Sequence, residues 1–135
     1  MASLLFGLDF VFGKRNVAKT EEDHRLTSSR LVNEFIEAYE QSNSKYLSDN
    51  GESAILRIRG TVASITRDGE GKIVVLLKEQ GDEAGVSCTF DHSPRGINKN
   101  DVVAIKGEIH LGAQYDVDLK MYENAILEHC TLDKT

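Results

Sequence analysis

The hydrophobic pattern of this chain changes its period near residue 50. Upstream of Asp49, apolar residues recur every three to four positions, as on one face of an α-helix. Downstream of Gly51, β-branched and aliphatic residues alternate with polar ones, as in strands with one buried face. A chain of 135 residues with one such change fits a single domain with one core.

The helical pattern begins around Leu26. One stripe of the helix would contain Leu31, Phe35, Ala38, Tyr39, Ser42 and Tyr46. Thr27 suits the N-cap, because its hydroxyl can accept a hydrogen bond from an otherwise unpaired amide of the first turn. Asp49, Asn50 and Gly51 would end the helix and start a turn. The sequence therefore predicts one amphipathic helix, whose apolar stripe covers an open end of the barrel that follows. A partner protein or a membrane surface is the alternative for this stripe.

Five segments have the composition of β-strands. They are Ala54–Arg67, Lys72–Lys78, Ala84–Phe90, Asp101–His110 and Tyr115–Leu127. In the first segment the alternation slips between Val62 and Ile65, which predicts a bulge or a strong bend near Gly60. In the last, Val117, Leu119 and Met121 are aligned, and Asn124 is expected to mark a bend. Five strands with internal glycines predict a small closed barrel with few free edges.

Two of these segments resemble a known family. ILRIRGTVASI resembles the first strand of OB domains, and NKNDVVAIKGEI resembles the fourth. Together with LTSSRLVNEFIEAYEQSNSKYL and GVSCTF, they make residues 14–132 similar to the tRNA-anticodon-like OB-fold family of bacterial proteins. The resemblance implies a mainly β (α+β) fold, a five-stranded OB-type barrel preceded by one amphipathic α-helix. It implies a binding fold without establishing tRNA binding.

The N-terminal residues differ in composition from the rest. Residues 1–13 are apolar but too few to span a bilayer, and Lys14 and Arg15 follow them. Two interpretations remain open: a flexible or surface-docked terminus, and the tail of a membrane anchor. The resemblance favours an anchor, because members of the family often carry one just before a short basic stretch. We therefore expect a flexible or anchor-proximal segment over residues 1–25, a domain over 26–132, and either an envelope or a cytoplasmic location.

The charge balance disfavours a broad nucleic-acid-binding surface. The formal net charge is −6, and residues 51–130 contain nine Lys or Arg against 13 Asp or Glu, a balance of −4. Proteins that bind nucleic acid usually have a basic face, because phosphate neutralisation supplies much of the affinity. Any basic groove on this barrel would have to be local.

The two cysteines, Cys88 and Cys130, do not form a CxxC motif. A zinc knuckle or a thioredoxin-type site is therefore unsupported. Two interpretations remain open for them: small buried hydrophobic residues, or a disulfide in an oxidising compartment.

No catalytic or metal-binding constellation is apparent in the sequence. Asp91, His92 and Ser93 are adjacent in a turn, where they cannot form a nucleophile–base chain through space. Asp116 and Asp118 would share one strand face. Two such carboxylates more often face solvent than bind a cation. The histidines are scattered and are expected at the surface: His24, His92, His110 and His129. The sequence therefore predicts no enzyme, no metal site and no cofactor.

Two main functions remain open, and an inhibitor or immunity-type domain is a third possibility, because a compact acidic domain can complement a basic enzyme. The first is a non-enzymatic binding or adaptor module for a protein, a peptide or an oligosaccharide, near a membrane through its N-terminus. The second is single-stranded nucleic-acid binding on the face made by the second and third strands. The candidate ligand-binding residues are Arg57, Arg59, Arg67, Lys72 and Lys78 for charge and Tyr115 for stacking. A positive groove with an exposed ring would favour nucleic acid, and an apolar or acidic groove would favour the first function.

Overall fold

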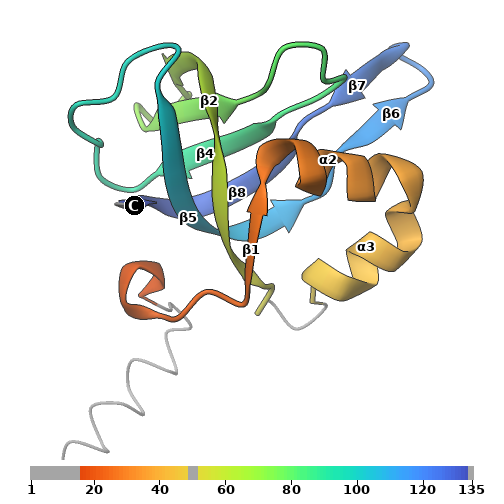
Figure 1. Cartoon of the computed structure of the whole chain (residues 1–135), viewed down its shortest axis with the longest axis horizontal. Helices are drawn as coiled ribbons and strands as arrows, with labels where there is room; N and C mark the ends of the chain where they lie inside the picture. The colour runs from red at the N-terminus through yellow and green to blue at the C-terminus, as the bar shows by residue number, and fades with distance from the viewer. Residues whose placement is uncertain (1–15, 49–51, 134–135) are drawn as a thin grey trace, which may run out of the picture.

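Five strands close into a barrel in the computed structural model, which describes residues 16–48 and 52–133 (Figure 1). The barrel strands are β2 (Ile55–Arg67), β3 (Ile73–Leu77), β4 (Val86–Phe90), β5 (Val102–Leu111) and β8 (Ala125–Asp133). They are hydrogen-bonded in the order β2-β3-β4-β8-β5, and β5 pairs with β2. The OB-type barrel expected from the sequence is confirmed.

The long strand β2 bends, and it can therefore pair with two neighbouring strands. Its residues 55–61 pair with β5, and its residues 62–67 pair with β3. The pairing with β3 shifts between Val62 and Ser64, so the bulge expected in this strand is present. Gly60 lies just before the shift, and a Cβ there would stand 2.7 Å from Ser28 Oγ. Glycine at this position therefore lets a helix approach the strand closely.

The barrel core is made by the alternate side chains that face inward. It includes Leu56, Ile58, Val62, Val75, Leu77, Val86, Cys88, Phe90, Ile105, Ile109 and Leu127. Cys88 and Cys130 are both buried and are not joined in a disulfide, so they act as small hydrophobic residues. Burial raises the pKa of the Cys130 thiol well above its ordinary value, and the neighbouring Cys88 raises it further.

The helical region contains two helices, where the sequence predicted one. They are α2 (Ser28–Glu37) and α3 (Tyr39–Tyr46), separated at Ala38, which has φ −149°. In a straight helix Phe35 and Tyr46 would lie about 16 Å apart along the axis. Their ring centroids are 5.8 Å apart, because the break folds α3 back on α2. The N-cap is as expected, since the Thr27 hydroxyl accepts a hydrogen bond from the Arg30 amide at 3.2 Å.

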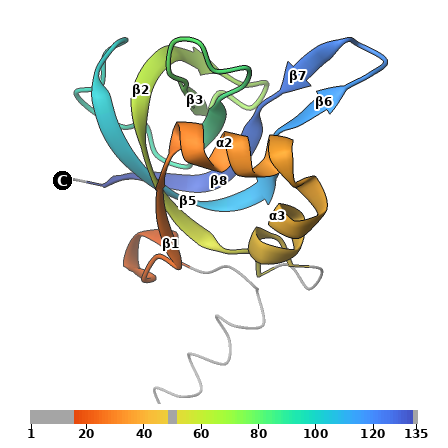
Figure 2. The ribbon, with the colours of Figure 1, turned by 45° about the vertical axis from the view of Figure 1, so that its right-hand side comes forward.

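Helix α2 closes one end of the barrel (Figure 2). Leu31, Val32 and Phe35 are almost completely buried, and they belong to the same core as the inward-facing strand residues. The Phe35 ring fits against Gly112, where a Cβ would stand 2.2 Å from the ring. The expected packing of an apolar helical stripe on the barrel end is confirmed.

Residues 16–25, part of the segment expected to be flexible or anchor-proximal, contain regular structure. A 3-10 turn, η1, spans Val17–Lys19, and strand β1 spans His24–Thr27. Strand β1 runs parallel to β2 and pairs with it from Leu56 to Arg59. The anchor expected within residues 1–13 lies outside the described residues. Within the described ranges, no helix is long and apolar enough to cross a membrane.

The prediction of a fifth strand over Tyr115–Leu127 is wrong in its position. Those residues form a hairpin of β6 (Gln114–Asp116) and β7 (Met121–Glu123), and the fifth barrel strand, β8, begins only at Ala125. The chain turns after Asp116, whose side chain accepts hydrogen bonds from the amides of Asp118 and Leu119. Asp116 and Asp118 therefore belong to a turn and do not share a strand face.

The contact between Phe35 and Gly112 can be tested by substitution. We expect Gly112→Ala to lower the free energy of unfolding by about 1–3 kcal/mol, because its methyl group would overlap a buried ring. Gly69→Ala is the matched control, since a Cβ at Gly69 would meet no atom within 4 Å. Denaturant unfolding of both variants measures the effect. Equal stability of the two would contradict the tight packing of this barrel end.

The ionisation of Glu34 should couple stability to pH. Partial burial alone would raise the pKa of Glu34. Hydrogen bonds from Tyr46, at 2.7 Å, and from Arg30 outweigh burial, and the nearby charge of Lys45 adds to them. The pKa of the Glu34 carboxyl is therefore lower in the folded chain than in the unfolded chain.

Because of the lowered pKa of Glu34, the free energy of unfolding is expected to be larger at neutral pH than in acid. The carboxylate stabilises the fold above its unfolded-state pKa, and the contribution disappears as the pH falls through the folded-state pKa. Glu34→Gln should lower the free energy of unfolding by about 1.5 kcal/mol at neutral pH and by less in acid. Unfolding curves from neutral pH to pH 3 measure the difference between the two proteins. A difference that stays constant over that range would show that the ionised carboxylate contributes nothing.

Candidate functional site

The outer surface of β3 and β4 carries no charged side chain. We call this surface the strand face; it consists of Val74, Leu76, Ser87 and Thr89. Val74 pairs with Thr89 and Leu76 with Ser87, so aliphatic and hydroxyl groups lie side by side. All four residues are partly exposed, while the alternate residues of both strands point into the core or pack against it. The strand face is therefore a neutral, mixed surface.

The β6–β7 hairpin projects from the barrel beside α2 (Figures 1 and 2). It forms a separate two-stranded sheet, inserted between β5 and β8. Four of its large apolar side chains are strongly exposed: Tyr115 (47%), Val117 (72%), Leu119 (63%) and Met121 (53%). We call these four residues the hairpin tip. Because exposed apolar groups gathered in one place often mark a binding surface, the hairpin tip is a candidate site.

Local interactions hold the hairpin tip in shape. Tyr115 and Tyr122 pack edge to face with their centroids 4.9 Å apart. Asp116 caps the turn through its two amide hydrogen bonds, and Lys120 adopts a left-handed conformation with φ 56°. The Gln114 amide donates to Glu123 at 3.2 Å across the two strands. The tip is therefore presented on an ordered turn with its apolar groups directed to solvent.

The structure does not bring the candidate ligand-binding residues together. Arg57 and Arg59 lie on the outside of β2 where it pairs with β5, whereas Tyr115 lies on the hairpin. Arg57 is already engaged, since its Nε lies 2.6 Å from Asp133 Oδ2 and its side chain is only 13% exposed. Arg59 is exposed opposite Ala104.

The other three basic candidates lie at the ends of β2 and β3. Arg67 donates a hydrogen bond to the Gly71 carbonyl across the β2–β3 turn at 2.8 Å. Lys72 lies 3.5 Å from Asp91, so an acidic group partly neutralises it. Lys78 follows β3 at the opposite end and is partly buried. The six residues therefore form no continuous basic groove.

Strand pairing creates one basic row that the sequence did not reveal. Arg57 lies between Arg25 of β1 and Lys106 of β5 in register. Acidic partners accompany the row, because Arg25 pairs with Glu22 and Arg57 with Asp133. Residues 25 and 106 are far apart in the chain, and only the parallel pairing of β1 with β2 places them together.

Comparison with known proteins agrees with this architecture. The model of the tRNA_anti-like family matches residues 10–121. The chain belongs to the tRNA_anti-like family. No curated protein matches it. Members of the tRNA_anti-like family have a binding-type OB domain, and the fold described above is that of a binding module.

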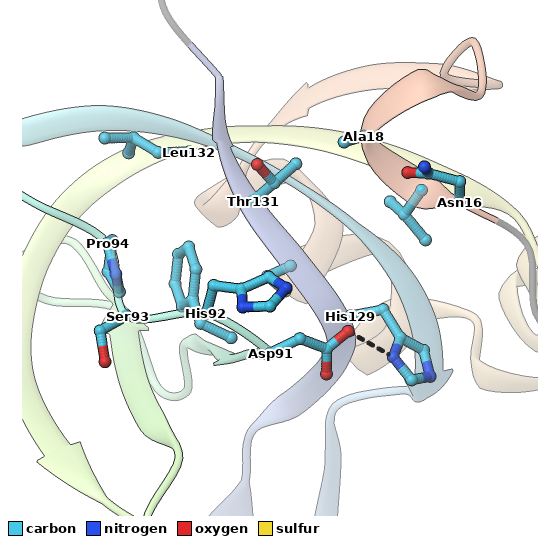
Figure 3. Close-up of a pocket in the computed structure, with 12 residues that line it drawn as sticks. Asn16, Ala18, Asp91, His92, Ser93, Pro94, His129, Thr131 and Leu132 are labelled. Atoms are coloured by element: carbon cyan, nitrogen blue, oxygen red, sulfur yellow. Dashed lines mark hydrogen bonds and ion pairs between the residues drawn. The ribbon is translucent and has the colours of Figure 1, made fainter.

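The tRNA_anti-like barrel also has a pocket of about 460 Å³ (Figure 3). The η1 turn, the last residues of β8 and the loop after β4 line it. Asp91 and His129 meet at this pocket, with 2.9 Å between Asp91 Oδ2 and His129 Nδ1. Ser93 also lines the pocket, but in the described part of the chain its hydroxyl has no hydrogen bond to a histidine.

The Asp91 carboxyl is held in its charged form. Partial burial alone would raise the pKa of Asp91, but the hydrogen bond from His129 and the charge of Lys72 outweigh it and lower the pKa. From the sequence alone, Asp91 is expected in a turn, and the histidines are expected to be scattered over the surface. His129 is 38 positions from Asp91, and only the pairing of β4 with β8 brings them together.

Proposed function

We propose that this chain is a non-enzymatic binding module whose ligand is a protein segment with exposed apolar residues. The observation that carries the proposal is the hairpin tip, with its four exposed apolar side chains. Tyr and Met are enriched at protein interfaces, and both occur in the tip. An isolated two-stranded hairpin is only marginally stable in water. Burial of the tip by a partner would therefore stabilise the hairpin as well as the complex.

The surfaces around the tip support a protein ligand. The strand face is uncharged, and the chain as a whole carries a net charge of −6. The hairpin itself contains Asp116, Asp118 and Glu123 against Lys120 alone. An apolar segment with basic flanking residues would match this arrangement best, because its charges would complement the acidic rim of the tip.

A peptide-binding experiment tests this proposal. A random-peptide display library is selected on the folded chain, and recovered peptides are resynthesised and titrated. We expect peptides with clustered apolar residues, and a loss of affinity of about tenfold or more with Val117→Ser. Val102→Ser is the matched control, because Val102 is also strongly exposed (55%) but lies on the barrel strand β5. Neither substitution should change stability noticeably, since both side chains are exposed.

The control separates the outcomes. Affinity that falls with Val117→Ser and survives Val102→Ser supports binding at the hairpin tip. Equal losses in both variants, or no selected peptide with apolar character, would exclude the tip as the binding surface.

The second candidate, single-stranded nucleic-acid binding, is favoured by the basic row of Arg25, Arg57 and Lys106. Against it, Glu22 and Asp133 already pair with two of these residues. A ligand phosphate would have to displace those carboxylates, and its affinity would fall steeply with added salt.

Fluorescence anisotropy with labelled mixed-sequence DNA and RNA single strands tests this candidate. At low salt we expect no binding up to roughly 50 μM protein, the range in which non-specific binders already respond. Salt-sensitive binding that disappears in the double variant Arg25→Ala, Lys106→Ala would reverse the order of the two candidates.

A further inference from the structure

The pairing of β5 with β8 is interrupted by two β-bulges, and each bulge contains a histidine. Lys106 pairs with Thr131 and Glu108 with Glu128, so two residues of β8, His129 and Cys130, lie opposite Gly107 alone. Ile109 pairs with Leu127 and Leu111 with Ile126, so His110 is an extra residue on β5. Such bulges re-aim side chains and occur often beside functional sites.

The backbone at His129 is held in an unfavourable conformation. Its φ is 56°, in the left-handed region that a residue with a side chain rarely adopts within a strand. The opposing Gly107 makes room for this bulge, because a Cβ there would stand 2.6 Å from Cys130 Sγ. Strain of this kind persists only where the surroundings enforce it, and it is concentrated at functional sites.

The two bulges bring three metal-binding groups together on the outside of the barrel. One ligand atom from each of Glu108, His110 and His129 lies within 4.8 Å of the other two. His110 Nε2 is 3.5 Å from Glu108 Oε1, and the two imidazole centroids are 6.3 Å apart. Ligand atoms around a tetrahedral zinc ion are about 3.3 Å apart. The side chain of His110 is 45% exposed, so it can rotate to close the remaining gap.

A fourth residue fixes the orientation of one ligand. Asp91 lies 2.9 Å from His129 Nδ1, which leaves Nε2 as the ring nitrogen available to an ion (Figure 3). A carboxylate that holds the second nitrogen of a ligating histidine is the usual outer partner in zinc sites. Asp91 comes from the end of β4, so three strands contribute to the arrangement.

We propose that Glu108, His110 and His129 bind a divalent transition-metal ion, and that Asp91 positions His129. Two imidazoles and one carboxylate suit zinc, because imidazole nitrogen is a borderline ligand that zinc favours and that magnesium and calcium bind poorly. Three protein ligands leave a fourth position of the ion open to water or to a group of a bound molecule. The same side chains as simple ion pairs would need neither the two bulges nor the strained His129.

Titration calorimetry with zinc chloride, on the full chain, tests the proposal. We expect one zinc ion per chain, and visible absorption bands when cobalt(II) replaces zinc in the site. His110→Ala and His129→Asn should each lower the affinity about 100-fold or more, and Asp91→Ala about 10- to 100-fold. Asparagine is used at position 129 because it tolerates a left-handed backbone, so this variant should keep the fold.

His92→Ala is the control, because His92 is exposed and lies next to Asp91 in sequence but outside the three-residue cluster. Its zinc affinity should equal that of the unaltered chain. Thermal unfolding without metal checks that every variant is folded. Absence of zinc binding by the unaltered chain would overturn the proposal, and so would zinc affinities of His129→Asn and His110→Ala equal to that of the unaltered chain.

Discussion

The burial of the α2 stripe in one end of the barrel is the interaction on which the rest of the structure depends. Leu31, Val32 and Phe35 become part of the barrel core, and each such side chain contributes about 1.5–3 kcal/mol when buried. Two glycines, Gly60 and Gly112, admit the helix by leaving out a Cβ. With this end closed, the pocket beside η1 and the outer surfaces of the strands remain accessible.

Elements with one buried face could be predicted from the sequence, whereas elements fixed by distant contacts could not. Strands β2 to β5 lie within one or two residues of their predicted bounds, because their alternation reflects burial directly. The break at Ala38 was not predictable, since Ala38 continues the apolar stripe. Val117, Leu119 and Met121 alternate as a core strand would, yet they are exposed. The alternation of apolar and polar residues indicates which side chains share a face of a strand. It does not indicate whether that face is buried.

The candidate sites depend even more on pairing between distant segments. Arg57 is a candidate ligand-binding residue from the sequence, but Asp133, 76 positions away, engages it. His110 and His129 are separated by 19 positions, and no regular spacing rule would join them. Their proximity depends on the two bulges, which nothing in the alternation of β5 or β8 indicates. The spacing of residues along the sequence can identify metal-binding residues only where the backbone between them is a regular helix or strand.

The parallel pairing of β1 with β2 also sets the direction of the chain between η1 and the helices. It directs the chain from η1, beside the ends of β5 and β8, toward the helices (Figure 1). The β6–β7 hairpin lies on the opposite side of the barrel from η1 (Figure 2). A partner bound at the hairpin tip would therefore leave the η1 side of the barrel uncovered.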